Sequence, residues 1–131
     1  MNKIILISGT LLGLLSVVIG AFGAHGLKEL ISIESIQTFE TGVRYQMYHA
    51  LLLLFIGSAP NVSPKNKKTC YYLVLIGLVF FSGSIYGLAT NSLTLFDFKS
   101  IAFITPIGGL LLILSWAILL IGFLKLKDDK L

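Results

Sequence analysis

Charged side chains are scarce in this chain, because only 12% of its 131 residues are Asp, Glu, Lys or Arg. A soluble domain carries about 25% charged residues. Hydrophobic residues make up 56% of the chain, and most of them form long continuous runs. This combination predicts an integral membrane protein. The length allows one domain over residues 1–131 and leaves no room for a separate soluble catalytic domain.

Cysteine and acidic residues are also missing where chemistry would need them. A single cysteine, Cys70, excludes an intramolecular disulfide bond. The long apolar runs contain no Asp or Glu, whereas hydrolysis or group transfer needs a nucleophile with a base, or paired carboxylates. Ser82 or Ser84 could approach His49, but no acid is available to orient the imidazole. We therefore expect no enzyme activity and no catalytic residue.

The two histidines, His25 and His49, have no cluster of cysteines or carboxylates near them in the sequence. The sequence therefore predicts no metal site and no cofactor. A haem-binding bundle is a remote alternative, because His49 should lie roughly 12 Å deeper in the membrane than His25. The formal net charge of +4 comes without a basic face bearing exposed aromatic residues, so we expect no nucleic-acid partner.

Four apolar stretches are candidates for membrane-spanning helices, at residues 4–24, 41–58, 70–90 and 101–124. A helix rises 1.5 Å per residue, so about 20 residues cross the hydrocarbon core. The predicted fold is an all-α integral membrane protein, a bundle of four transmembrane helices. The first stretch could alternatively be a secretory signal peptide, but its apolar core exceeds the usual 7–15 residues.

Two connecting segments have their own character. Residues 27–38 mix isoleucines and leucines with charged residues, which suits a short interfacial helix after the first span. The same residues could instead form the first turns of the second span. Residues 59–69 contain Pro60, Pro64 and three lysines, which predicts a basic loop.

The second span begins with polar side chains, which are costly at membrane depth and need partners. At about 100° per residue, Arg44, Tyr45, Gln46 and His49 share one side of the helix. Apolar residues such as Met47 occupy the other side. We therefore expect the polar side to face the bundle and the apolar side to face lipid.

Small residues recur at four-residue or similar spacing and predict close helix packing. The predicted packing positions are Gly9, Gly13, Ser16 and Gly20 in the first span, and Gly83 and Gly87 in the third. Glycine faces of this kind also predict self-association of the chain into a homo-oligomer.

The fourth span contains a predicted helix break at Pro106, Gly108 and Gly109. Pro106 could be the first residue of the helix, with Thr105 as its cap. It could instead kink a helix that began near Ile101. Trp116 lies near the middle of this span, so we expect it to pack against a neighbouring helix.

The distribution of lysine and arginine predicts the orientation of the chain. One side of a four-span topology would carry Lys3, Lys65, Lys67, Lys68, Lys125, Lys127 and Lys130, and the other Lys28, Arg44 and Lys99. Both termini should therefore be cytoplasmic in the plasma membrane. His25, the polar start of the second span, Tyr86 and Thr105 then converge toward the outer leaflet.

Four motifs occur in order along the chain: GAFGAHGL at 20–27, TGVRYQMYHALLLL at 41–54, FSGSIYGL at 81–88 and TPIGG at 105–109, with Trp116 following. In this order and spacing they resemble the domain-of-unknown-function-423 family of small bacterial membrane proteins. The resemblance covers nearly the whole chain. It implies a four-span membrane protein and carries no established biochemical activity.

We therefore expect a non-enzymatic membrane-homeostasis or accessory protein that acts through lipid or protein contacts. The polar cluster of His25, Arg44, Tyr45, Gln46, His49, Tyr86 and Thr105 is a possible ligand or lipid site, or a structural hydrogen-bond network. Lys65, Lys67 and Lys68 should attract anionic lipid. The alternative is a small channel or carrier for an anion or neutral solute that uses this cluster.

Overall fold

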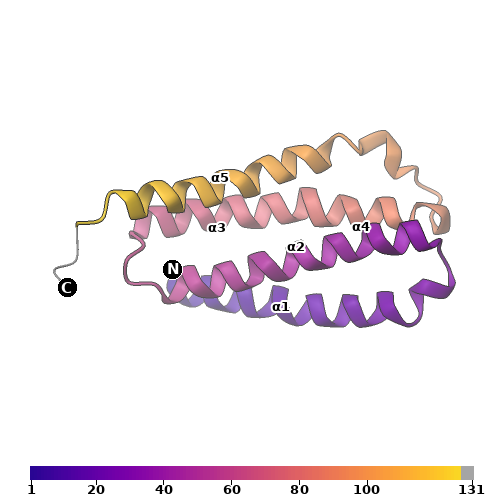
Figure 1. The fold of residues 1–131 in the computed structure, drawn as a ribbon, viewed down its shortest axis with the longest axis horizontal. Helices are drawn as coiled ribbons and strands as arrows, with labels where there is room; N and C mark the ends of the chain where they lie inside the picture. The colour runs from indigo at the N-terminus through magenta and orange to yellow at the C-terminus, as the bar shows by residue number, and fades with distance from the viewer. Residues whose placement is uncertain (128–131) are drawn as a thin grey trace.

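The computed structural model describes residues 1–127, and all regular structure in that range is helical. The α-helices are α1 (Asn2–Ala24), α2 (Ile33–Ser58), α3 (Pro64–Leu78), α4 (Ser84–Ala89) and α5 (Ile104–Leu124). A π-helical segment, Val79–Gly83, joins α3 and α4 into one continuous rod. Figure 1 shows α1, α2, the α3–α4 rod and α5 side by side, with the N-terminus and the end of α5 at the same end.

The all-helical class predicted from the sequence is confirmed for the described residues. Three helical stretches are long and apolar enough to cross a membrane: Asn2–Glu29, Pro64–Ala89 and Ile104–Leu124. Helix α2 is long enough at 26 residues, but its first half is too polar to qualify by composition. α2 lies against α1 on one side and against the α3–α4 rod on the other.

The segment after α1 differs from the interfacial helix expected at 27–38. Only Leu27–Glu29 forms a short 3₁₀ turn. Ser32 is extended, with ψ 161°, and its side chain accepts a hydrogen bond from the Ser35 amide, so it caps the next helix. Helix α2 therefore begins at Ile33, and the alternative interpretation is correct for residues 33–38.

The basic loop is also shorter than the predicted 59–69. Ser63 caps α3 by accepting from the Asn66 amide, and Pro64 occupies the first turn, where its missing N–H has no cost. The three lysines of this segment therefore lie on the first turns of α3. Residues 128–131, including Lys130 of the predicted charged tail, lie outside the described residues.

Pro106 does not break a helix. Helix α5 begins at Ile104, so Pro106 lies in its first turn, where backbone N–H groups have no intrahelical acceptor. A separate 3₁₀ turn, Phe98–Ile101, precedes it. Both predicted alternatives are therefore wrong: the helix does not start near Ile101, and Thr105 does not cap it. Thr105 instead bonds to Ser84 of α4.

The small residues of α1 pack against α2 within the same chain. A Cβ atom added to Gly9 would lie 2.9 Å from the carbonyl oxygen of Ala50, and one added to Gly20 would lie 3.2 Å from Val43. Gly13 also lies at this interface, against Ala50. Ser16 is buried, and its hydroxyl donates to the carbonyl oxygen of Leu12 in the same helix. This stripe serves an intrachain contact.

The second predicted glycine pair behaves differently. Nothing lies within 4 Å of a Cβ added to Gly83, and Gly87 packs against the ring of Phe98. The close approach of the α3 rod to α5 uses Gly77 and Gly108 instead. A Cβ on Gly108 would lie 2.4 Å from the Phe81 amide nitrogen. Gly83 and Gly87 are therefore not the helix-packing pair that their spacing predicts, and Gly108 is a packing residue rather than a break.

A hydrophobic core runs along the middle of the bundle, where Ile5, Leu53, Ile56 and Val74 are fully or almost fully buried. A smaller cluster of Leu27, Phe39 and Ala89 lies at the end of the bundle where α1 and α4 end. Large apolar side chains also cover the outward faces of α1 and α5, where they are exposed. Exposure of this kind suits helices that are surrounded by lipid.

Candidate functional site

The centre of the predicted polar cluster is Gln46 of α2, which is only 5% exposed. Its Nε2 donates to the carbonyl oxygen of Leu12 in α1 at 2.9 Å. Its Oε1 accepts from the hydroxyl of Tyr86 in α4 at 2.6 Å. One amide side chain thus joins three helices, and both of its polar atoms are paired.

One turn further along α2, His49 is 4% exposed and uses both ring nitrogens. Its Nδ1 lies 2.7 Å from the carbonyl oxygen of Tyr45, which can only accept. Its Nε2 lies 3.1 Å from Nε1 of Trp116 in α5, which can only donate. The imidazole is therefore neutral, protonated on Nδ1, and joins α2 to α5.

Two serines extend the network around the π-helical segment. Ser82 donates to the carbonyl oxygen of Gly42 in α2 at 2.8 Å. Ser84 donates to the carbonyl oxygen of Phe81, so Thr105 of α5 must donate to the Ser84 hydroxyl. A π turn departs from regular α-helical geometry. At this point the two serines attach the α3–α4 rod to α2 and to α5.

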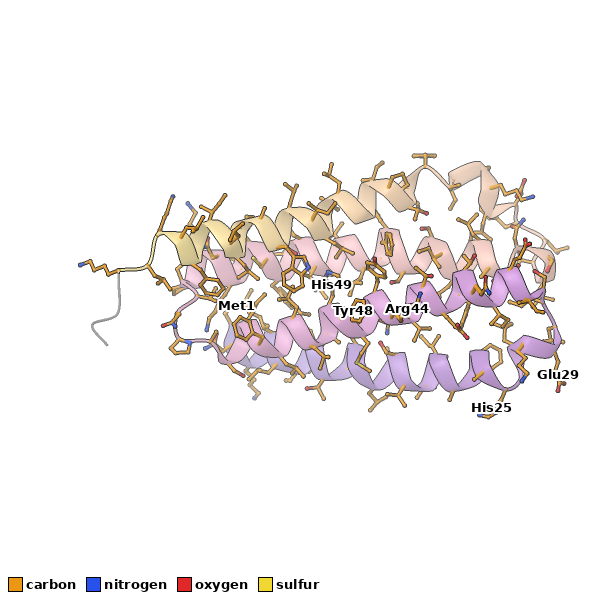
Figure 2. The ribbon with its side chains drawn as sticks, viewed as in Figure 1. Met1, His25, Glu29, Arg44, Tyr48 and His49 are labelled. Atoms are coloured by element: carbon orange, nitrogen blue, oxygen red, sulfur yellow. The ribbon has the colours of Figure 1, made fainter. Side chains whose placement is uncertain are left out.

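Three members of the predicted cluster lie outside this network. His25 is exposed, and Figure 2 shows it on the outer side of α1, near that helix's end and well along the bundle from His49. Arg44 is exposed and bonds only to Thr41 of its own helix. The side chain of Tyr45 is 38% exposed, and its ring packs on Phe81 at 4.9 Å. The convergence of His25 and Arg44 with the cluster was therefore predicted wrongly, whereas the ring of Tyr45 does meet the cluster, because it stacks on the ring of His49 with centroids 6.4 Å apart.

Further hydrogen bonds between helices occur outside the predicted cluster. The Ser8 and Tyr71 hydroxyls are 2.8 Å apart, joining α1 to α3. Cys70 donates through its thiol to the carbonyl oxygen of Ser115 in α5 at 3.5 Å. Lys67 is 7% exposed and donates to the Asn2 side chain at 3.1 Å. Ser8 and Ser115 are serines in otherwise apolar runs, which is a weak sequence signal for the first two contacts. The contact between Lys67 and Asn2 has no such signal.

The buried polar side chains of the described residues are paired within the bundle. Within residues 1–127, no buried side-chain nitrogen or oxygen lacks a hydrogen-bond partner. The same range holds no group of three or more His, Cys, Asp or Glu side chains close enough to bind a metal. Each polar side chain at the centre is already paired with another helix, so the arrangement is suited to holding the helices together.

The fold and this internal network define an all-helical integral membrane protein. The model of the DUF423 family, described as a protein of unknown function, matches residues 19–109. The chain belongs to this family.

Curated relatives span nearly the same length. A UPF0382 membrane protein of Staphylococcus saprophyticus is 41% identical over 95% of this chain and 99% of its own. The UPF0382 membrane protein YwdK of Bacillus subtilis is 38% identical over 94% of this chain and 98% of its own. The UPF0382 inner membrane protein YgdD of Escherichia coli is 34% identical over 96% of this chain and 93% of its own. No solved structure matches the chain.

Proposed function

We propose that the chain crosses the plasma membrane four times, with both termini on the cytoplasmic side. Three rods are apolar and long enough to span, and α2 lies alongside them over a comparable length. Its polar side chains do not oppose this, because Gln46 and His49 are buried and paired. A relative described as an inner membrane protein supports the location.

The charge distribution supports this orientation. The end of the bundle that carries the N-terminus and the last turn of α5 holds six described lysines: Lys3, Lys65, Lys67, Lys68, Lys125 and Lys127. The opposite end carries Lys28 and Lys99, together with the four acidic residues of the described range, Glu29, Glu34, Glu40 and Asp97. Lysine-rich ends of membrane proteins face the cytoplasm.

We further propose a non-enzymatic role as a membrane-homeostasis or accessory protein that acts through contacts with lipid. The observation that carries this proposal is the pairing of Gln46, His49, Tyr86 and Trp116 with one another or with backbone. Side chains that are used to join helices are not available to a substrate. The outward apolar faces, by contrast, are free to meet acyl chains.

The alternative of an anion or solute carrier finds less support. A carrier needs polar groups that face a wet path, whereas Arg44 and His49 line none of the hollows between α2 and α5. Gln46, Ser82 and Tyr86 do line a separate hollow of about 420 Å³, but the rest of its wall is apolar. A haem-binding bundle is disfavoured because His49 has both nitrogens engaged and His25 lies far along the bundle from it.

Sided cysteine labelling tests the topology. In a Cys70→Ala background, Asn61→Cys and Lys99→Cys place one thiol in each of two loops at opposite ends of the bundle. An impermeant maleimide added to spheroplasts should label only the cysteine at 99, and should reach the cysteine at 61 after lysis. Labelling of the cysteine at 61 in intact spheroplasts would refute the orientation.

The membrane role is tested by comparing a strain that lacks the gene with one that is complemented. We expect membrane order, measured by diphenylhexatriene anisotropy, or phospholipid composition to change in the deletion strain. Wild type and Arg44→Ala should both restore it, because Arg44 is exposed and outside the network. Unchanged anisotropy and composition in the deletion strain would count against the lipid role.

A further inference from the structure

A groove runs between α2 and α5 toward the end of the bundle that carries the N-terminus and the last turn of α5. Its inner part has a volume of about 480 Å³ and is lined by Tyr48, Leu51, Leu52, Phe55, Trp116, Leu119, Leu120 and Phe123. A second hollow of about 490 Å³ shares Phe55 and Phe123 with the first and reaches Asn61. A third, of about 220 Å³, shares Asn61 and Phe123 and continues to Lys125. Because neighbouring hollows share wall residues, they form one groove, called here the α2–α5 groove.

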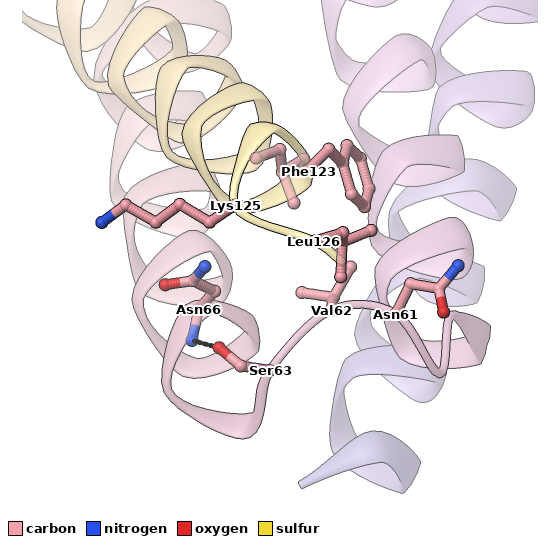
Figure 3. A pocket seen from close by; sticks show the side chains of 9 residues that line it. Asn61, Val62, Ser63, Asn66, Phe123, Lys125 and Leu126 are labelled. Atoms are coloured by element: carbon pink, nitrogen blue, oxygen red, sulfur yellow. Dashed lines mark hydrogen bonds between the residues drawn. The ribbon is translucent and has the colours of Figure 1, made fainter. Parts of the chain in front are cut away.

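The groove changes from apolar to polar along its length. From Tyr48 to Ser58 its α2 wall rises about 15 Å at 1.5 Å per residue. This is about half of the 30 Å hydrocarbon core, the depth of one leaflet. The outer end is lined by the side chains of Asn61, Ser63, Asn66 and Lys125 (Figure 3). The groove therefore has the length and polarity of a single lipid molecule.

The charge at the polar end has one sign over the described residues. Lys125 lines the groove, and exposed lysines at positions 65 and 68 lie outside it on the first turns of α3, at the same end of the bundle. The acidic residues within residues 1–127 all lie at the opposite end of the bundle. Asp128 and Asp129 follow in the sequence, outside the described range. No side-chain hydrogen bond occupies the amides of Asn61 and Asn66 within residues 1–127.

We propose that the α2–α5 groove binds one anionic glycerophospholipid of the cytoplasmic leaflet. An acyl chain lies along Leu51, Phe55 and Leu120, and the phosphate lies near Lys125. The amides of Asn61 and Asn66 donate to the headgroup oxygens. Among the described residues that line the groove, none is acidic and so none could bind the ammonium group of a zwitterionic lipid. The leaflet assignment rests on the proposed topology, whereas binding at this groove does not.

Native mass spectrometry of the full-length protein tests this proposal. The protein is released from nanodiscs that contain equal amounts of phosphatidylcholine and phosphatidylglycerol. We expect the bound phosphatidylglycerol to exceed phosphatidylcholine about fivefold, in line with one basic residue at a lipid surface. Lys125→Gln should remove most of this preference. Lys68→Gln, an equal loss of charge on an exposed residue outside the groove, should keep it.

A second pair of variants tests the acyl wall. Leu120 and Leu124 are 60% and 75% exposed on α5, and only Leu120 lines the groove. Leu120→Trp should lower the retention of both lipids at least threefold, and Leu124→Trp should leave it unchanged.

Three results would overturn the proposal: equal retention of the two lipids by the wild type, equal effects of Lys125→Gln and Lys68→Gln, or a lipid-free dimer that Leu120→Trp abolishes. The last result would assign the groove to a second copy of the chain. Failure of the labelling experiment alone would overturn the topology and leave lipid selection in nanodiscs standing.

Discussion

Replacing Gln46 by leucine perturbs the centre of the polar network with little change in size. The variant loses the bond to the Leu12 carbonyl and the bond from Tyr86. Hydrogen bonds between membrane helices contribute about 0.6 kcal/mol on average and at most about 1.7 kcal/mol each. The Leu12 carbonyl keeps its bond from Ser16, but the Tyr86 hydroxyl loses its acceptor, at a cost of about 1 kcal/mol. We therefore expect a loss of about 2 kcal/mol, or roughly thirtyfold in the folding equilibrium constant.

The assay is SDS titration of the purified protein in mixed micelles, followed by the fluorescence of Trp116, the only tryptophan in the chain. Gln37→Leu is the matched control, because Gln37 is exposed on the same helix and its side chain bonds to no described residue. Glutamine and leucine have similar helix propensities, so the control should stay within about 0.5 kcal/mol of the wild type. If Gln46→Leu matches the control, the network does not stabilise the bundle.

A double-mutant cycle isolates the Gln46–Tyr86 bond. Tyr86→Phe alone removes the donor and leaves Oε1 of Gln46 without it. The two changes combined should destabilise less than the sum of the separate effects, with a coupling energy of about 1 kcal/mol. Strict additivity would show that the 2.6 Å contact carries no interaction energy.

The remaining predictions concern other contacts in the bundle, measured in the same titration. Gly108→Ala should destabilise by about 1–3 kcal/mol, because the new Cβ would lie 2.4 Å from the Phe81 amide nitrogen. Gly83→Ala, which meets open space, should be neutral or stabilise by up to about 1 kcal/mol, and equal effects of the two would contradict the packing. His49→Leu removes the acceptor of the Trp116 indole and should shift its emission to the blue, whereas His25→Leu, at an exposed position, should not. Arg44→Ala should leave the free energy of unfolding within about 0.5 kcal/mol.

Helical periodicity predicted the two central members of the network and could not predict their partners. Gln46 and His49 lie on one side of α2 because they are three positions apart, and that side packs against other helices. Their acceptors include the backbone carbonyls of Leu12 and Tyr45. Every residue has such a group, so no sequence pattern distinguishes the ones that are used.

The errors at the ends of the cluster have a different cause. His25 and Arg44 are polar residues near an expected membrane boundary, where side chains can reach water without joining a network. The sequence indicates how deep a residue lies in the membrane, but it does not specify in which direction the side chain points around the helix axis. His25 follows the last residue of α1 and points outward.

Glycine spacing was informative in α1 and misleading in α3–α4. The α1 stripe runs with a regular spacing over a long, straight helix, so one partner helix can meet all of it. Gly83 ends the π-helical segment, whose wider turn changes the register of the faces that precede and follow it. The effective pair, Gly77 and Gly108, belongs to two helices and has no spacing signature in the sequence.

The polar side chains inside the bundle are paired with one another and with backbone. The most direct test is ¹⁵N solid-state NMR of the protein in lipid bilayers. His25→Gln leaves His49 as the only histidine. We expect a neutral ring with a protonated Nδ1 and an Nε2 that accepts a hydrogen bond from Trp116. A ring protonated on Nε2, or on both nitrogens, would contradict it.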